Sequence, residues 1–290
     1  MLSLIICARA NDIPLSLKKN IADTIGADYE IVVIDNSDNS HSIFSAYNLG
    51  AQKSKYPYLC FMHDDIAFHT QNWGELVSNH FNDEKTGAIG IAGTPYVPYM
   101  PGSWWGGNLV NINILSDREG SEHHSFQAIP PTTANKNNVL ILDGVWFCIR
   151  KSLFDKIRFD DVTYSGFHFY DVDTTMQVSQ AGYNVYCVFD ILIKHFSEGD
   201  INETWIQNAL AFNKKWSAVL PVACTQLQYG TRCEAELKTL NEFARMLIAN
   251  GWPHKKAYKT VLFMLLKHFR IYFYYKTPAY LGKYLMKSLN

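Results

Sequence analysis

The residues best suited to chemistry in this 290-residue chain are carboxylates that directly follow apolar runs. Asp64 and Asp65 come after YLCFM, in HDDI. Two adjacent carboxylates repel each other, and a cation offsets that repulsion, so the pair predicts a divalent-metal site. Carboxylate oxygens favour Mg²⁺ or Mn²⁺, and either ion can also hold diphosphate oxygens. The alternative is a solvated strand end without a metal.

Asp35 follows the apolar run IVVI and opens the turn DNSDNS. A carboxylate there can accept hydrogen bonds from a ribose hydroxyl or a base N–H, which predicts a nucleotide contact. The alternative is a purely local role, in which Asp35 caps the next helix or forms an Asx-turn.

Two further groups of polar residues lie later in the chain. In FYDVDTTMQ, Asp171 and Asp173 begin a predicted helix, where acidic residues also suit the helix dipole without any catalytic role. The functional interpretation makes Asp171 a general base that takes a proton from an acceptor hydroxyl. His195, in IKHFSEGD, follows a predicted strand, and its neutral imidazole would complete a metal site with Asp65. A packed or surface histidine is the alternative.

These residues need a scaffold that brings strand ends together. Apolar runs at 2–7, 31–34, 58–62 and 88–92 alternate with polar stretches that are long enough for one helix each. This alternation predicts parallel βαβ units in an α/β fold. Ligands of open α/β sheets bind off the carboxyl ends of the strands, so the polar residues after the first three runs should meet in one crevice.

The middle of the chain is less regular. Residues 94–138 are rich in Pro, Gly and aromatic residues and lack periodicity, which predicts a functional loop or lid. Strands are predicted again at 139–142, 145–149 and 184–189, with a helix at 170–181. After about residue 202 the pattern is helical, with breaks near Pro221, Gly230 and 251–253.

Charge is distributed unevenly along the chain, although the net charge is only -1. Residues 254–290 contain eight Lys or Arg and no acidic residue, whereas the rest contains 18 basic and 27 acidic residues. This basic, aromatic tail is typical of a peripheral membrane contact. A small helical subdomain or a dimer interface is the alternative, and the sequence leaves the oligomeric state open. Nucleic-acid binding is not expected, because the basic residues form no recognised motif.

Missing motifs weaken the case for dinucleotide-binding, P-loop, serine hydrolase and zincin sites. There is no GxGxxG, GxxxxGK[ST], GxSxG or HExxH sequence. The six cysteines form no CxxC pair and lie mostly in apolar runs, which predicts reduced, buried thiols. The N-terminus lacks the pattern of a signal peptide, and no apolar run approaches the ~18–20 residues of a membrane span. We therefore expect a cytoplasmic protein, free or at the inner face of the cell membrane.

Four motifs, in this order, resemble the family 2 glycosyltransferases of GT-A fold. They are VVIDNSDNS, AYNLGAQKSKYPYLCFMHDDI, LDGVWFCIRKSLFDKI with FYDVDTTMQVSQAGYNVYCV, and VFDILIKHFSEGD. The resemblance covers about residues 1–216. It implies a Rossmann-like, mostly parallel sheet flanked by helices in a catalytic domain over 1–220. A helical extension, basic and aromatic, is expected over 221–290.

Carried over position by position, the resemblance implies roles for individual residues. Asp65 would bind the metal with His195 as an additional ligand, and Asp171 would be the general base. The nucleotide-sugar site is expected to contain Ala8, Arg9, Asn11, Asp35, Asn48, Asp64 and Gly144. The acceptor side is expected to contain Trp104, Trp105, Tyr170 and Asp173, with core packing as the alternative for the two tryptophans.

Three positions depart from the family pattern. His63 replaces the usual first Asp of the DXD motif, so the predicted metal site depends more heavily on Asp65. Tyr170 replaces the acidic neighbour of the general base. Ala10 replaces an aromatic residue of the first-strand motif, which weakens any stacking on the base.

The resemblance implies an inverting hexosyltransferase of polysaccharide biosynthesis. The donor would be a nucleotide-diphosphate sugar, with a UDP-sugar favoured, held by Mn²⁺ or Mg²⁺. The acceptor would be a hydroxyl of a glycan or a lipid-linked molecule. A nucleotidyltransferase is one alternative, but ICARANDIPL lacks the basic, Gly-rich loop expected there. A catalytically inactive nucleotide- or sugar-binding protein of the same fold is the other, which the altered positions 63 and 170 favour.

Overall fold

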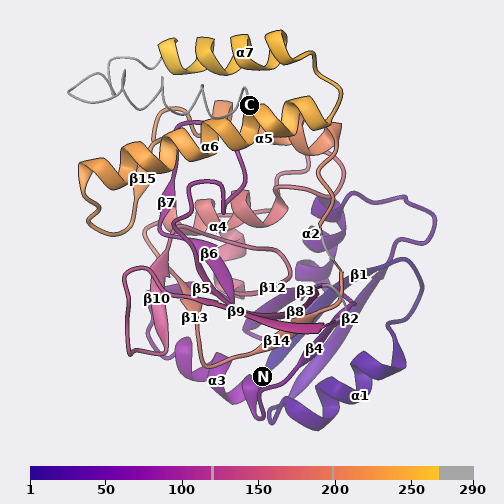
Figure 1. Ribbon diagram of the computed structural model, residues 1–290. Helices are drawn as coiled ribbons and strands as arrows, with labels where there is room; N and C mark the ends of the chain where they lie inside the picture. The colour runs from indigo at the N-terminus through magenta and orange to yellow at the C-terminus, as the bar shows by residue number, and fades with distance from the viewer. Residues whose placement is uncertain (119–120, 198, 268–290) are drawn as a thin grey trace.

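The computed structural model describes residues 1–118, 121–197 and 199–267. The centre of the fold is a seven-stranded sheet. Its strand order is β10-β13-β5-β12-β3-β1-β2 (Figure 1). The strands are β1 (Leu2–Ala8), β2 (Tyr29–Asp35), β3 (Tyr58–Met62), β5 (Thr86–Gly90), β10 (Lys136–Val139), β12 (Trp146–Arg150) and β13 (Asn184–Val188). Strands β1, β2, β3, β5 and β13 run in one direction, and β10 and β12 run against them. The predicted mostly parallel α/β fold is therefore confirmed.

Helices cover both faces of this sheet. Helices α2 (Ile43–Lys53) and α4 (Tyr170–Gln180) pack on one face, and α1 (Leu15–Thr24) and α3 (Trp73–His80) pack on the other. Alternate side chains of a strand point to opposite faces, so Leu4 and Ile6 of β1 join the apolar cluster under α1 while Ile5 joins the cluster under α2. Burial on both faces explains the continuous apolar runs seen in the sequence.

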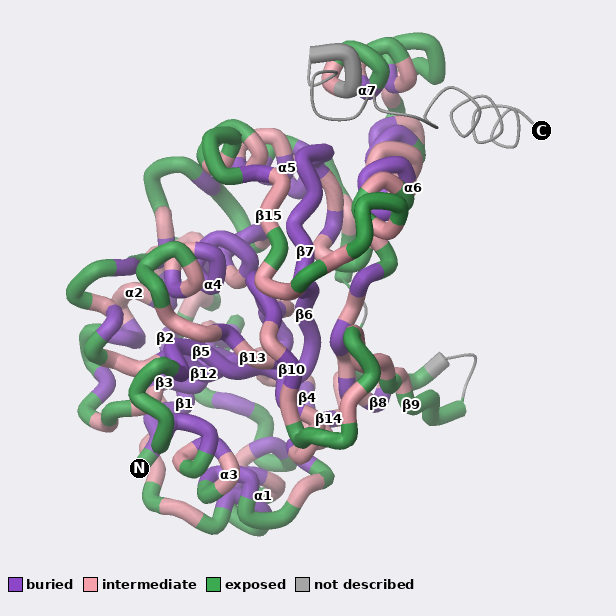
Figure 2. Tube along the Cα trace, turned by 90° about the vertical axis from the view of Figure 1, so that its left-hand side faces the viewer, coloured by how far each residue is buried: buried purple, intermediate pink, exposed green. Residues whose placement is uncertain are grey.

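A second sheet occupies much of the stretch that was predicted to be irregular. Its order is β11-β6-β8-β14-β4, with β9 paired to β8. The strands are β4 (Ile66–Phe68), β6 (Ala92–Thr94), β8 (Asn111–Arg118), β9 (Ser121–Gln127), β11 (Ile141–Leu142) and β14 (Ile193–His195). Figure 2 shows the β8–β9 hairpin at the rim of the molecule, with β9 largely exposed. The prediction of a lid over all of 94–138 is therefore wrong, because the polar face of β9 conceals its strand pattern.

The C-terminal part is helical and packs on the same core. Its elements are α5 (Glu203–Lys215), the short β15 (Val222–Ala223) paired with β7 (Tyr96–Val97), α6 (Tyr229–Ala249) and α7 (His254–Lys267). Phe243 and Leu247 of α6 belong to the apolar cluster under α2 and α4. The breaks near Gly230 and Gly251 are confirmed, because α6 begins at Tyr229 and ends at Ala249. A domain division at residue 220 stays a prediction.

Buried Glu236 connects α6 to the loop that carries the two predicted acceptor-side tryptophans. Its carboxylate accepts hydrogen bonds from the Tyr96 hydroxyl at 2.7 Å and from the backbone N–H groups of Tyr99 and Met100 at 2.8 and 3.2 Å. Charge-assisted hydrogen bonds of this kind are strong in a low-dielectric interior. Helix α6 therefore fixes the first residues of this loop, Tyr99 and Met100.

The structure corrects the prediction that all six cysteines are reduced. Cys60 and Cys148 are register partners on β3 and β12 and form a disulfide, so the expectation of six reduced thiols is wrong for this pair. Their separation of 88 residues gave no sequence signal.

Among the described residues, no helix combines the length and apolarity needed to cross a membrane. Most of the predicted membrane-contact segment, from residue 268 on, lies outside the described residues.

Candidate functional site

The carboxyl ends of the central parallel strands gather the predicted polar residues at one edge of the sheet. Ala8 ends β1 directly beside its register partner Asp35 at the end of β2. Arg9 and Asn11 follow on the exposed loop after β1. The Asp35 carboxylate is exposed and accepts one hydrogen bond from the Ser37 N–H at 2.9 Å, which leaves acceptor capacity for a ligand.

Three side chains beyond the end of β3 form a metal-ligand cluster. His63 follows β3, and the antiparallel pairing of β4 with β14 places His195 opposite Ile66, next to Asp65. The His63 Nδ1 lies 3.3 Å from the His195 Nε2. The Asp65 Oδ1 lies 3.4 Å from the His195 Nε2 and 3.8 Å from the His63 Nδ1. Ligand atoms that share one divalent ion at about 2.1 Å lie about 3–3.5 Å apart. The cluster therefore fits a metal ion, and it contains His63 in addition to the two predicted ligands.

The protonation states of His63 and Asp65 suit metal binding. Burial lowers the pKa of His63, and the neighbouring His195 lowers it further. Burial works against ionisation of Asp65, but hydrogen bonds with His195 and Ser197 hold its pKa well below its usual range. At neutral pH the cluster therefore presents a neutral His63 and an ionised carboxylate, which are the forms that bind metal ions.

Asp171 lies in the first turn of α4. Burial raises its pKa to about 7, and the negative charge of Asp143 adds to this effect, while backbone N–H groups including that of Gly144 oppose it. A general base works best when its pKa is close to the working pH. The environment of Asp171 therefore gives it the basicity to accept a proton near neutrality.

Asp143 is a site residue that the sequence reasoning missed. Its Oδ2 accepts a hydrogen bond from the Trp104 Nε1 at 2.8 Å, and its Oδ1 accepts one from the Val145 N–H at 3.0 Å. The carboxylate is thereby fixed beside Asp171. Its position directly before Gly144 in ILDGVW, after an apolar run, was the available signal.

The site matches a known family by sequence. A family model described as a glycosyltransferase-like family matches residues 5–217. The chain belongs to this glycosyltransferase-like family. The streptomycin biosynthesis protein StrF of Streptomyces griseus is 25% identical over 196 residues. That match covers 63% of this chain and 64% of StrF, so the chain spans less than two thirds of the length of that relative.

One solved structure supports the fold of this glycosyltransferase-like chain. The structure of GalNAc-T7 with UDP, GalNAc and Mn²⁺ aligns with a TM-score of 0.53 at 13% identity, covering 90% of this chain and 54% of the other. A197 from STIV aligns more weakly, with a TM-score of 0.40 at 13% identity over 68% of this chain and 86% of that protein. The similarity to GalNAc-T7 shows that the fold is GT-A.

Gly144 and Tyr170 lie between the His63–Asp65–His195 cluster and Asp171 of this family member. Tyr170 is only 3% exposed, so it lies inside the site rather than on the acceptor side where it was predicted. A Cβ atom on Gly144 would lie 2.1 Å from the Tyr170 hydroxyl oxygen and 3.0 Å from Asp171 Oδ2. Gly144 is therefore required for close packing of these groups.

Two predicted site residues stabilise the fold instead. Both polar atoms of the Asn48 amide bind the backbone of Phe159, at 2.8 and 3.0 Å, so this side chain does not face the donor. Asp173 is 0% exposed and accepts hydrogen bonds from Lys215 and Trp216, each at 2.8 Å. Its carboxylate is part of the α4–α5 contact, and its placement on the acceptor side was wrong.

Replacing Asp173 with alanine should destabilise the protein by about 3–5 kcal/mol, because Lys215, the Tyr164 hydroxyl and the Trp216 Nε1–H all lose this fully buried acceptor. The melting temperature should fall by roughly 6–20 °C, at about 2–4 °C per kcal/mol for a domain of 150–250 residues. Asp160→Asn is the matched control, since Asp160 pairs with the same Lys215 at 2.7 Å but is partly exposed. Equal melting temperatures for the two variants would contradict the structural role of Asp173.

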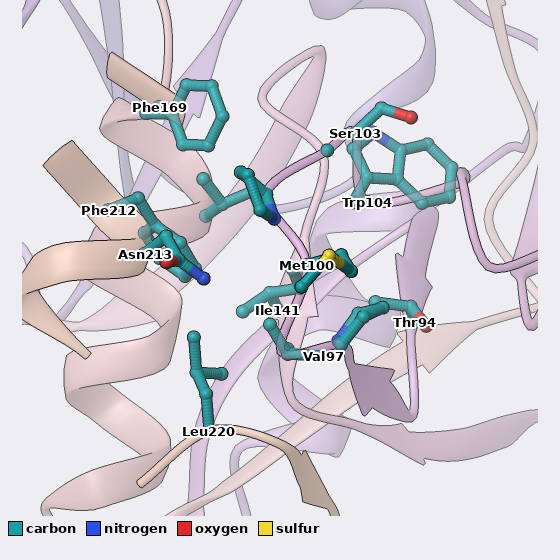
Figure 3. Close-up of a pocket in the computed structure, with 14 residues that line it drawn as sticks. Thr94, Val97, Met100, Ser103, Trp104, Ile141, Phe169, Phe212, Asn213 and Leu220 are labelled. Carbon is teal, nitrogen blue, oxygen red and sulfur yellow. The ribbon is translucent and has the colours of Figure 1, made fainter. Parts of the chain in front are cut away.

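The two tryptophans behave differently from each other. Trp104 is half-buried and holds Asp143, whereas Trp105 is 43% exposed and packs edge-on against Trp104. Figure 3 shows Trp104 at the border of a cavity between the loop after β7, α4 and α5. This cavity has a volume of about 20 Å³, room for about one water molecule. A cavity of this size is too small to hold a sugar.

Proposed function

We propose that the protein is an inverting, metal-dependent glycosyltransferase that moves a sugar from a nucleotide-diphosphate sugar to a hydroxyl of a glycan or lipid-linked acceptor. The observation that carries the proposal is the His63–Asp65–His195 cluster. It lies beyond the carboxyl end of β3, in an α/β fold whose Asp171 has the basicity of a general base. Membership of a glycosyltransferase-like family supports the reaction class.

The donor atoms of the cluster favour Mn²⁺ over Mg²⁺. Two of the three are imidazole nitrogens, whereas Mg²⁺ prefers oxygen ligands and strict octahedral geometry. A structure of GalNAc-T7 contains Mn²⁺ together with UDP, and the fold is shared. When bound, the ion would supply positive charge to the diphosphate as it leaves.

The nucleotide would lie along the ends of β1 and β2. Asp35 would accept hydrogen bonds from the ribose or the base, with a UDP-sugar as the favoured donor. Arg9 and Asn11 are exposed on the neighbouring loop, where a guanidinium group and an amide can contact polar groups of the donor. Asp64 is half-buried. Burial raises the pKa of Cys7 on β1, and the negative charge of Asp64 adds to this effect.

The transfer step would be a single displacement. Asp171 takes the proton of the acceptor hydroxyl as its oxygen attacks the anomeric carbon, and the bond from that carbon to the diphosphate breaks on the opposite side. The configuration of the sugar therefore inverts. Hydrogen bonds from the backbone N–H groups of Gly144 and Val172 hold the Asp171 carboxylate in place.

Exposed aromatic rings near the site would bind the acceptor. Phe167 is 49% exposed, and its ring lies 5.6 Å from that of His63 and 5.8 Å from that of Tyr170. Trp105 is exposed on the neighbouring loop. Aromatic faces pack on the apolar faces of sugars, so these two rings are the proposed acceptor platform.

A thermal-shift screen of nucleoside diphosphates and nucleotide sugars tests this function. At least one nucleotide should raise the melting temperature with Mn²⁺ and much less with EDTA, because ligands that bind only the folded state stabilise it. For the best nucleotide sugar, Mn²⁺-dependent release of the nucleoside diphosphate should follow. If no nucleotide shifts the melting temperature, or shifts are equal in EDTA, the proposal is wrong.

A further inference from the structure

Two of the positions at which this chain departs from the family pattern contact each other. The His63 Nε2 lies 3.0 Å from the hydroxyl oxygen of Tyr170, and that hydroxyl donates a hydrogen bond to the Gly144 carbonyl at 3.0 Å. The Tyr170 ring is almost fully buried and packs edge-on against Phe44 and Tyr47. The hydroxyl is therefore held between the imidazole and the carbonyl.

Hydrogen-bond counting fixes the direction of the contact with His63. A tyrosine hydroxyl has one hydrogen, and a carbonyl oxygen only accepts. Because the Tyr170 hydrogen goes to Gly144, the imidazole has to donate its Nε2 hydrogen to the Tyr170 oxygen. A neutral imidazole protonated at Nε2 has an unprotonated Nδ1. That atom faces His195 Nε2 at 3.3 Å.

We propose that Tyr170 is a positioning residue that holds His63 in the Nε2-protonated tautomer and so makes its Nδ1 a metal ligand. The proposal rests on the metal-dependent function proposed above. Metal-binding histidines commonly donate their second ring N–H to an oxygen that fixes the tautomer and the ring orientation. The oxygen in this chain is a phenol, supplied by the residue next to the base, so the replacements at 63 and 170 act together.

Gly144 connects this arrangement to Asp171. Its carbonyl accepts the hydrogen bond from Tyr170, and its N–H donates to the Asp171 carboxylate. Because Gly144 binds both Tyr170 and Asp171, a shift of Tyr170 changes the position of the His63 ring relative to the Asp171 carboxylate. Tyr170 thereby fixes the spacing between the metal cluster and the base.

Nitrogen NMR of the histidine rings tests the tautomer without any metal. The signals of His63 are those that disappear in the His63→Gln variant. In the metal-free parent protein we expect His63 to be protonated at Nε2, and in Tyr170→Phe we expect a mixture of tautomers. A parent His63 protonated at Nδ1, or a tautomer that is unchanged in Tyr170→Phe, overturns the proposal.

Titration with MnCl₂ alone provides a second readout. Tyr170→Phe should weaken Mn²⁺ binding about 10- to 100-fold, and an affinity equal to that of the parent overturns the proposal. Tyr47→Phe is the matched control, because this buried neighbour donates to the Met62 carbonyl and its affinity should stay within about twofold of the parent. If the parent binds no Mn²⁺ while the tautomer still changes in Tyr170→Phe, the positioning role is supported and the metal-dependent function is wrong.

Discussion

Replacing Asp171 with asparagine should lower turnover about 100-fold or more and leave the affinity for the donor nearly unchanged. An asparagine has the size of an aspartate and can still accept the N–H of Gly144, but it cannot take the proton of the acceptor. The kcat and the donor Kd, measured side by side, separate these effects. Turnover equal to that of the parent would remove Asp171 as the base.

The pH dependence gives an independent check of the same residue. Because the pKa of Asp171 is raised to about 7, the parent should gain activity as the pH rises from 6 to 8 and the carboxyl loses its proton. Asp143→Asn removes a neighbouring negative charge, so the rise should move to lower pH. A profile that stays in place in Asp143→Asn would contradict the coupling of the two carboxyls.

Stability should show the opposite trend. A carboxyl with a raised pKa binds its proton more tightly in the folded state, so the contribution of Asp171 to stability falls as the pH rises from about 4 to about 7. Asp171→Asn lacks this penalty. Its melting temperature should exceed that of the parent at pH 8 and approach it at pH 4.

Replacing Asp65 with alanine should abolish the promotion of nucleotide binding by Mn²⁺. The loss of Mn²⁺ affinity should exceed the roughly 10- to 100-fold expected from removing a residue that only orients a ligand. Asp65 is the single carboxylate of the cluster, so its removal leaves two neutral imidazoles. Calorimetric titration of UDP with and without Mn²⁺ measures the effect.

Asp64→Asn is the matched control for Asp65→Ala. Asp64 is adjacent in sequence and carries the same charge, but it is not part of the three-residue cluster. Mn²⁺ promotion should therefore largely survive in Asp64→Asn. Equal losses in the two variants would mean that the general negative charge of the segment, rather than a ligand at Asp65, attracts the ion.

The scaffold of the site followed from the sequence, because local patterns determine it. The apolar runs that became β1 and β3 are continuous, since both faces of these strands are buried. The polar residues behind them meet at one edge of the sheet, as the rule for open α/β sheets predicts. The resemblance also paired Asp65 with His195, and the two lie 3.4 Å apart.

The role of His63 could not be predicted, because it depends on a distant residue. An imidazole presents either nitrogen, and the partner that we propose decides between them is Tyr170, 107 positions away. In the sequence, His63 stands where the DXD motif has its first carboxylate, which indicated a weakened metal site. The structure instead places its Nδ1 3.3 Å from the His195 Nε2. In the proposed metal site, the replacement therefore exchanges an oxygen ligand for a nitrogen ligand.

Buried polar residues were the main source of error. Asp173 and Asn48 have the residue types of a binding site, and only the folded structure shows that Lys215 and the Phe159 backbone use them. Asp143 was overlooked because the contact that places it in the site is also distant in sequence: its partner Trp104 lies 39 positions earlier. Sequence pattern gives the residue type and the strand end, whereas tertiary contacts decide which groups remain free for a substrate.

Calorimetric titration of UDP into the parent protein, with and without Mn²⁺, tests the central claim that the His63–Asp65–His195 cluster holds a metal ion for a nucleoside diphosphate. Binding should be strong with Mn²⁺ and weak in EDTA, and Asp65→Ala should bind weakly in both. Other nucleoside diphosphates extend the titration if another nucleotide proves to be the donor. Binding that is equal with and without Mn²⁺ for every nucleoside diphosphate would contradict the metal-dependent function.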